Sequence, residues 1–122
     1  MASSLVERFR PFVPAFLFAL FILYLSTLDG RDLPEVDIVN ADKLVHAGCY
    51  AVFTFLISRG FLKSVSHTRP WLSAVIATAY GLAMEWIQGT FFTYRTADMI
   101  DAAANGIGAL AAALCIPFLL KK

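Results

Sequence analysis

The stretch Pro11–Leu28, with the sequence PFVPAFLFALFILYLSTL, decides how this chain folds. It contains 18 residues without a charge, between Arg10 and Asp29. A helix needs about 20 residues to cross the ~30 Å hydrocarbon core of a bilayer. Since backbone groups in lipid must find hydrogen-bond partners within their own segment, the stretch predicts a membrane-spanning helix.

Both ends of this stretch fit a helix that stays in the mature protein. Its last residues offer no small-x-small cleavage site, and it is long for the apolar part of a signal peptide. Pro11 and Pro14 lie near its first turn, where a missing backbone N–H costs least. We therefore expect a retained helix that begins at about residue 11.

Three further apolar runs follow along the chain. Leu44–Ser58 and Ala102–Leu120 contain no charged residue. The segment between Arg69 and Arg95 contains a single charged residue, Glu85. Each run is close to the length that crosses a bilayer. Together with the first run, they predict four transmembrane helices at about residues 11–28, 43–62, 71–92 and 98–120.

The composition agrees with a membrane protein. The chain has 122 residues, of which 59% are hydrophobic and 16% charged, and its mean hydropathy is +0.70. A soluble domain this small needs far more polar surface. A net charge of +1 argues against nucleic acid as a partner, and two cysteines without a CxxC pair form no disulfide framework. Residues 1–122 are expected to form one domain, an all-α, four-helix integral membrane bundle.

The basic residues predict how this bundle is oriented. They gather before the first helix, between the second and third, and after the fourth, whereas the loop after the first helix is net acidic. Because basic loops stay in the cytoplasm, both termini are expected there. The basic residues are Arg8, Arg10, Arg59, Lys63, Arg69, Lys121 and Lys122.

Polar residues of the last three predicted helices share one depth in the outer half of the bundle. On each helix they recur at intervals of three or four residues, which places them on one face. At ~1.5 Å per residue, Glu85 and Asn105 lie about 10 Å below the outer end. The inner halves are expected to be almost purely apolar. The polar set is Asp42, Lys43, His46, Tyr50, Glu85, Gln88, Asp98, Asp101 and Asn105.

A carboxylate in a membrane costs several kcal/mol unless it is paired or protonated, so Glu85 is a functional hypothesis. The alternative is that polar residues only join helices, at ~0.6 kcal/mol per hydrogen bond on average. The convergence of Glu85 with His46 and Asp101 favours a site. By contrast, small residues on the last helix predict close packing and no chemistry. They are Ala102, Gly106, Gly108, Ala109 and Ala113.

The combined motif resembles the VanZ-like family of small bacterial membrane proteins. The resemblance covers about residues 42–108, and Arg95 joins the polar set through it. It implies a multi-pass protein of the bacterial inner (cytoplasmic) membrane. The member that gives the family its name is associated with low-level teicoplanin resistance. The motif runs Asp42-Lys43-x-x-His46-x-x-x-Tyr50, Glu85-x-x-Gln88 and Arg95-x-x-Asp98-x-x-Asp101-x-x-x-Asn105-x-x-Gly108.

Three interpretations of the polar layer remain open, and the first is that it binds an envelope headgroup. Lys43 and Arg95 would hold a phosphate or carboxylate, and Glu85, Gln88 and Asn105 would meet hydroxyls or amides. The expected partners are membrane lipid and a lipid-linked envelope precursor or a glycopeptide.

In the second interpretation the protein is an enzyme, with His46 and Glu85 as a base and acid pair. A divalent metal on Asp98, Asp101, Glu85 and His46 would extend this to phosphoryl or acyl chemistry, although no metal motif is intact. Metal and cofactor therefore stay open. In the third interpretation the layer only holds the bundle, as a structural module or the subunit of an oligomer.

Overall fold

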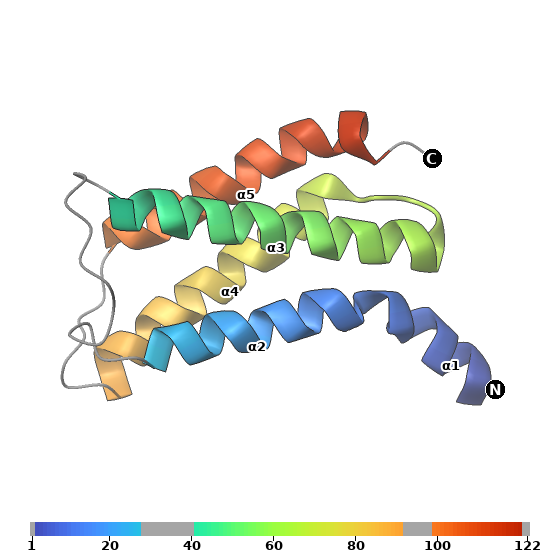
Figure 1. The fold of residues 1–122 in the computed structure, drawn as a ribbon, viewed down its shortest axis with the longest axis horizontal. Coiled ribbons are helices and arrows are strands. Elements are labelled where there is room, and N and C mark those ends of the chain that lie inside the picture. The colour runs from blue at the N-terminus through green and yellow to red at the C-terminus, as the bar shows by residue number, and fades with distance from the viewer. Residues whose placement is uncertain (1, 28–40, 92–98, 121–122) are drawn as a thin grey trace.

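The computed structural model describes residues 2–27, 41–91 and 99–120, and these residues form helices without a strand. The four longest helices lie side by side and alternate in direction, so that α1 begins and α5 ends at the same end of the molecule (Figure 1). The all-α prediction is confirmed. The elements are α1 (Ala2–Phe9), the 3-10 turn η1 (Arg10–Phe12), α2 (Val13–Thr27), α3 (Ala41–Val65), α4 (Pro70–Phe91) and α5 (Met99–Leu119).

The helix bounds agree with the predictions except at the first helix. Helices α3, α4 and α5 begin and end within a few residues of the predicted 43–62, 71–92 and 98–120. The predicted start at residue 11 is wrong, because the chain is already helical from Ala2. Pro11 has no N–H to continue an α-helix, and the chain passes it in a 3-10 turn in which the Val13 N–H bonds to the Arg10 carbonyl.

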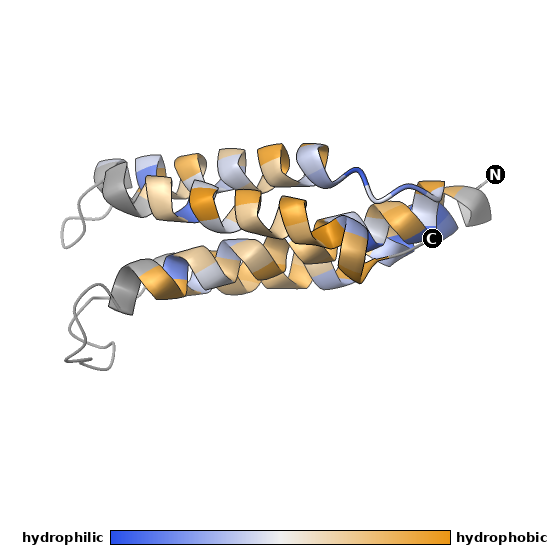
Figure 2. Ribbon diagram, turned by 90° about the horizontal axis from the view of Figure 1, so that it is seen from above, coloured by the Kyte–Doolittle hydropathy of each residue, from blue (hydrophilic) through white to orange (hydrophobic). Residues whose placement is uncertain are grey.

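Three segments among the described residues are long and apolar enough to cross a membrane: Leu5–Leu25, Leu44–Val65 and Ala102–Leu119. The fourth predicted span, α4, has 22 residues but is not among these three segments. Hydrophobic residues extend along most of the length of the helices (Figure 2). Many large ones are exposed, including Phe16, Leu17, Leu110 and Phe118, as expected for side chains that face lipid.

Helix α5 packs most closely on α3. A Cβ atom added to Gly108 would overlap the backbone of Ala47, at 2.7 Å from its carbonyl carbon, so the two helices touch there through backbone atoms. Ala109 and Ala113 on the same helix are fully buried. The prediction that small residues of this helix serve close packing is therefore confirmed.

Aromatic rings join α2, α3 and α4 near the middle of the bundle. The ring of Phe53 lies 5.2 Å from that of Tyr80, 6.2 Å from that of Tyr50 and 6.3 Å from that of Phe18, measured between centroids. The Tyr80 hydroxyl also donates a 2.5 Å hydrogen bond to the carbonyl of Ala19. These contacts hold α2 against the other helices.

Buried hydroxyls lie at the end of the bundle where α3 meets α4. Ser58 donates a 2.8 Å hydrogen bond to the hydroxyl of Ser73, which donates to the carbonyl of Arg69 at 2.9 Å. Thr54 donates to the Tyr50 carbonyl at 2.8 Å. The expectation that this half is almost purely apolar is therefore wrong. Hydroxyl groups bonded to one another or to nearby carbonyls fit inside an apolar helix pair without an unpaired polar atom.

Candidate functional site

A hydrogen bond between α3 and α5 lies at the centre of the candidate site. Nδ1 of His46 and Oδ1 of Asn105 are 3.1 Å apart, although 59 residues separate them in the sequence. Since an amide oxygen only accepts, the imidazole N–H at Nδ1 donates. Asn105 is 2% exposed, so the bond fixes the ring of His46 against the interior of the bundle.

Helix α4 meets this pair at Gly81. A Cβ atom added to Gly81 would lie 3.0 Å from Nδ2 of Asn105 and 3.1 Å from Cε1 of Tyr50. Such contacts would be tighter than most real Cβ contacts. Because glycine has no Cβ, the Asn105 amide and the Tyr50 ring can pack directly against the backbone of α4. Three helices therefore converge on Asn105: α3 through His46 and Tyr50, α4 through Gly81, and α5 through Asn105 itself.

Glu85 adds a carboxyl group one helical turn beyond Gly81. Its side chain is 4% exposed, and its charge lies within electrostatic range of Tyr50, which is itself 3% exposed. Glu85 and His46 each have a further interaction partner in the structure. The side chain of Trp86, the residue after Glu85, is exposed. We call His46, Tyr50, Glu85 and Asn105 the polar cluster.

The structure places the remaining predicted residues only in part. The backbones of Asp42, Lys43, Gln88 and Asp101 belong to α3, α4 and α5, but their side chains lie outside the described residues. The same holds for the whole of Arg95 and Asp98. Contacts between these side chains and the polar cluster therefore stay predictions.

The predicted metal alternative can be examined for two of its four ligands. Among the side chains that the structure describes, no group of three or more His, Cys, Asp or Glu residues is placed to hold a metal ion. His46 and Glu85 belong to this part of the chain. Asp98 and Asp101, the other two predicted ligands, lie outside it.

The polar cluster offers two kinds of chemistry. A neutral His46 that donates from Nδ1 carries its lone pair on Nε2, the nitrogen that can take up a proton. Tyr50 and Asn105 supply hydroxyl and amide groups, and Glu85 supplies an acid or a hydrogen-bond acceptor. Groups of these types can bind the hydroxyls and amides of a headgroup, or move a proton during a reaction.

Sequence reasoning missed Gly81, which provides the space at the centre of the cluster. Its spacing was a usable signal, because it lies four residues before Glu85 and hence on the same helix face. The contact between Gly108 and Ala47 was predicted only as general close packing. It lies next to both partners of the central hydrogen bond, since Ala47 follows His46 and Gly108 lies three residues after Asn105.

The comparisons with known proteins add no relative. No model of a protein family matches the chain, and neither a curated protein nor a solved structure shows significant similarity to it. The fold and the site together define an all-helical protein with three helices of membrane-crossing length and a buried polar cluster between α3, α4 and α5.

Proposed function

We propose that this chain is a multi-pass integral membrane protein whose polar cluster binds the headgroup of a cell-envelope or lipid-linked molecule. The observation that carries the proposal is the burial of Glu85, Tyr50 and Asn105 between three helices that also supply most of the hydrophobic core. A carboxyl group at such a position costs several kcal/mol unless it is compensated. Purely structural contacts between helices can be made from cheaper residues.

In this proposal α4 also crosses the membrane, as the fourth helix of the bundle. Its polar residues Ser73 and Glu85 are buried, whereas Val75 and Trp86 on its other faces are exposed. A helix with this distribution fits a bundle in lipid, with polar groups inside and apolar groups outside.

The proposed orientation puts both termini in the cytoplasm and the polar cluster in the outer half of the membrane. Arg59 and Lys63 near the end of α3, and Arg8 and Arg10 near the start of the chain, support it through their positive charge. His46 lies near the opposite end of α3, and the start of α1 and the end of α5 share the basic end (Figure 1). A ligand would then enter from the outer leaflet.

The ligand class follows from the chemistry of the cluster and from the resemblance to the VanZ-like family. Tyr50, Asn105 and Glu85 suit hydroxyl and amide groups, and the predicted cations Lys43 and Arg95 suit a phosphate or carboxylate. Glycopeptides such as teicoplanin act on cell-wall precursors outside the cell. We therefore propose a bacterial cytoplasmic-membrane protein that contributes to glycopeptide resistance through a lipid-linked envelope precursor or the glycopeptide itself.

One observation favours an enzyme as the second candidate function. The bond to Asn105 holds the imidazole of His46 in one orientation, as a catalytic base requires. Glu85 would be its acid partner, and a lipid-linked or phosphorylated envelope compound its substrate. With such a substrate, Glu85→Gln is expected to lower turnover by about 100-fold or more, and unchanged turnover would exclude this role.

The first experiment measures teicoplanin and vancomycin susceptibility of a sensitive host that expresses the wild type, Glu85→Gln or Trp86→Phe at matched membrane levels. We expect a teicoplanin-selective increase in resistance that Glu85→Gln abolishes and Trp86→Phe keeps. Trp86 is the matched control because it is adjacent but 63% exposed.

Two outcomes count against the proposal. Loss of membrane accumulation in both Glu85→Gln and Glu85→Ala would make the residue structural, as in the third interpretation. Normal accumulation without any shift in susceptibility would reject glycopeptide resistance, and mass spectrometry of co-purified lipids from wild type and Glu85→Gln would then test headgroup binding directly. If the same lipids co-purify with the wild type and with Glu85→Gln, headgroup binding by the polar cluster is rejected as well.

A further inference from the structure

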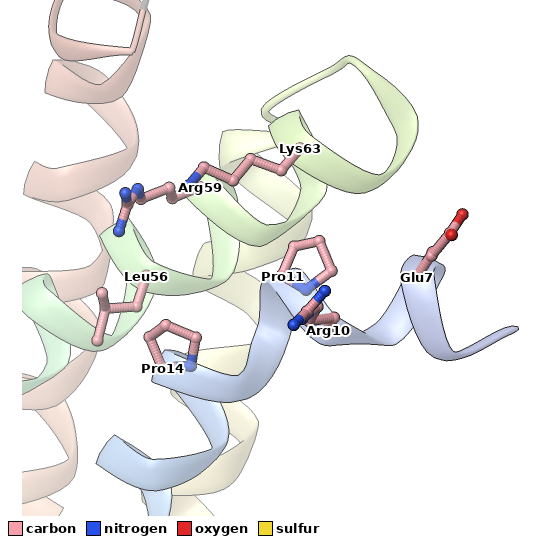
Figure 3. Close-up of a pocket in the computed structure, with 7 residues that line it drawn as sticks. All are labelled: Glu7, Arg10, Pro11, Pro14, Leu56, Arg59 and Lys63. Carbon is pink, nitrogen blue, oxygen red and sulfur yellow. The ribbon is translucent and has the colours of Figure 1, made fainter. Parts of the chain in front are cut away.

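A cavity lies at the end of the bundle opposite the polar cluster. It has a volume of about 290 Å³ and lies between the bend in the N-terminal helical segment and the second half of α3 (Figure 3). We call it the basic pocket. Its lining residues are Glu7, Arg10, Pro11, Pro14, Leu56, Arg59 and Lys63.

The walls of the basic pocket are fixed by contacts on both sides. The hydroxyl of Ser64 donates a 2.8 Å hydrogen bond to the carbonyl of Arg8, which ties α1 to α3. The ring of Phe12 lies over Gly60, so closely that an added Cβ would be 2.5 Å from its Cδ1 atom. It also meets the ring of Phe61 edge-on, with 5.1 Å between centroids. The pocket is therefore part of the packed fold.

Positive charge dominates the pocket. Arg10, Arg59 and Lys63 outnumber the single carboxylate of Glu7, and all four side chains are exposed. Arg10 comes from η1 and Arg59 and Lys63 come from α3, and guanidinium groups can bind a phosphate by donating two hydrogen bonds each. Glu7 lies on α1, at the edge of the labelled set in Figure 3.

The other wall residues are apolar, and the apolar surface continues from them along the helices. Leu17 is exposed one turn beyond Pro14 on α2, and Val52 is exposed one turn before Leu56 on α3. Both lie farther from the basic end of the bundle than the pocket does. A ligand with a charged head and an apolar tail would contact the cations and this apolar surface together.

The depth of the cations also fits a membrane interface. Arg10 and Arg59 fall inside the membrane-length segments Leu5–Leu25 and Leu44–Val65, and Arg59 lies about 9 Å from the end of its segment. Arginines at such positions extend their charge toward the headgroup layer. A phosphate in solution would need no apolar wall, whereas a phospholipid has both its phosphate and its acyl chains at this level.

We propose that the basic pocket binds the headgroup phosphate of an anionic phospholipid, with an acyl chain along Pro14, Leu17, Val52 and Leu56. Three cations against one carboxylate favour an anionic headgroup over phosphatidylcholine, whose ammonium group they repel. This site is independent of the proposed function of the polar cluster. It lies at the basic end of the bundle, which the proposed orientation puts at the cytoplasmic leaflet, where anionic lipids are concentrated.

The test is native mass spectrometry of the full chain in a neutral detergent, with phosphatidylglycerol or phosphatidylcholine of the same acyl chains. We expect the wild type to bind phosphatidylglycerol more tightly, and Arg10→Gln and Arg59→Gln each to weaken that binding about fivefold. Glu7→Gln is expected to strengthen it. Arg69→Gln is the matched control, because Arg69 lies at the same end but packs on Phe61 at 5.7 Å and does not line the pocket.

Three outcomes would overturn the proposal. If the two lipids bind equally well, the pocket does not select an anionic headgroup. If Arg69→Gln weakens binding as much as Arg59→Gln does, the lipid is held by the overall positive charge of this end and not by the pocket. Displacement of phosphatidylglycerol by an equal concentration of inorganic phosphate assigns the pocket to a free anion. Glu85→Gln should leave this lipid binding unchanged, so a failure here is distinct from a failure of the proposed function.

Discussion

The two ends of the helix bundle use polar residues in opposite ways. At the His46 end, Glu85 and Asn105 are buried and belong to different helices, and the bond between His46 and Asn105 links α3 to α5. At the Arg59 end, the charged groups Arg10, Arg59 and Lys63 are exposed, and the buried polar side chains in the part of the chain that the structure describes are the hydroxyls of Ser58 and Ser73.

This difference separates two kinds of polar burial in an apolar bundle. Thr54 and Ser73 each donate to a carbonyl four residues earlier in the chain, and Ser58 donates to the Ser73 hydroxyl, so these three hydroxyls cost little. The amide of Asn105 is bonded to His46 on α3 and lies against Gly81 on α4, so its burial depends on the exact approach of α3, α4 and α5. The His46 end should therefore be the more sensitive to changes in packing.

The largest effect is expected for Gly108→Ala, which tests whether close backbone contact holds the His46 end together. Its new methyl would overlap the carbonyl of Ala47, which cannot move without shifting α3. We expect the free energy of unfolding in mixed micelles to fall by at least about 3 kcal/mol. The measurement is a denaturant titration followed by circular dichroism.

Two other glycines serve as controls for Gly108→Ala. An added Cβ at Gly48 meets no atom within 4 Å, and at Gly106 it meets only Thr78, at 3.8 Å. Both Gly→Ala changes should leave stability unchanged or raise it by up to about 1 kcal/mol, because alanine favours the helix. If Gly108→Ala leaves stability unchanged, as these controls should, the His46 end is not especially sensitive to changes in packing.

A smaller effect is expected for Asn105→Ala, which removes the acceptor of the His46 ring. Because the ring N–H loses its partner, stability should fall by about 1–2 kcal/mol in the same titration. Leu110→Ala, at a half-exposed position of the same helix, should change it by less than about 0.5 kcal/mol.

A double-mutant cycle sharpens the Asn105 result. The coupling energy between His46→Ala and Asn105→Ala should reach about 0.6–1.7 kcal/mol, the range for hydrogen bonds between membrane helices. A coupling near zero would mean that the two side chains do not stabilise each other. The buried polar groups of the His46 end would then contribute as little to stability as the hydroxyls of the Arg59 end.

Much of the fold could be predicted from the sequence, because hydropathy and length determine where helices form in an apolar chain. The bounds of α3, α4 and α5 followed from the charges that flank each apolar run. The start of the first helix could not be predicted in this way. The apolar run begins after Arg10, whereas the helical segment begins at Ala2 and includes the charged residues Glu7 and Arg8. The 3-10 turn at Pro11 allows α1 to precede it without a break in the helical path.

The candidate site was predictable by helix face but not by contact. Spacing of three and four residues placed His46 with Tyr50 on one face, and the structure brings that face to Asn105. Which atoms bond depends on the rotation of one helix against another, and periodicity does not fix this rotation. The basic pocket needed the bend at η1, which places Arg10 and Arg59 in the lining of one pocket.

At the Arg59 end, Gly60→Ala tests whether Phe12 holds the wall of the basic pocket. The new methyl would force the Phe12 ring away from α3 and weaken its edge-on contact with Phe61. Alanine favours the helix more than glycine does, but the displaced ring costs more than this gain. We therefore expect the free energy of unfolding to fall by about 1 kcal/mol. Affinity for phosphatidylglycerol should fall as well, while Gly48→Ala should leave it unchanged.

The smallest effect is expected for the double change Ser58→Ala with Ser73→Ala. Removing both hydroxyls takes away donor and acceptor together, so no buried polar atom of this pair loses its partner, and the free energy of unfolding should change by less than about 0.5 kcal/mol. Teicoplanin susceptibility should match the wild type at equal membrane levels. A loss of 2 kcal/mol or more, on the scale expected of Asn105→Ala, would show that the hydroxyls of the Arg59 end are as indispensable as the polar cluster, and that the buried groups of the two ends differ only in kind.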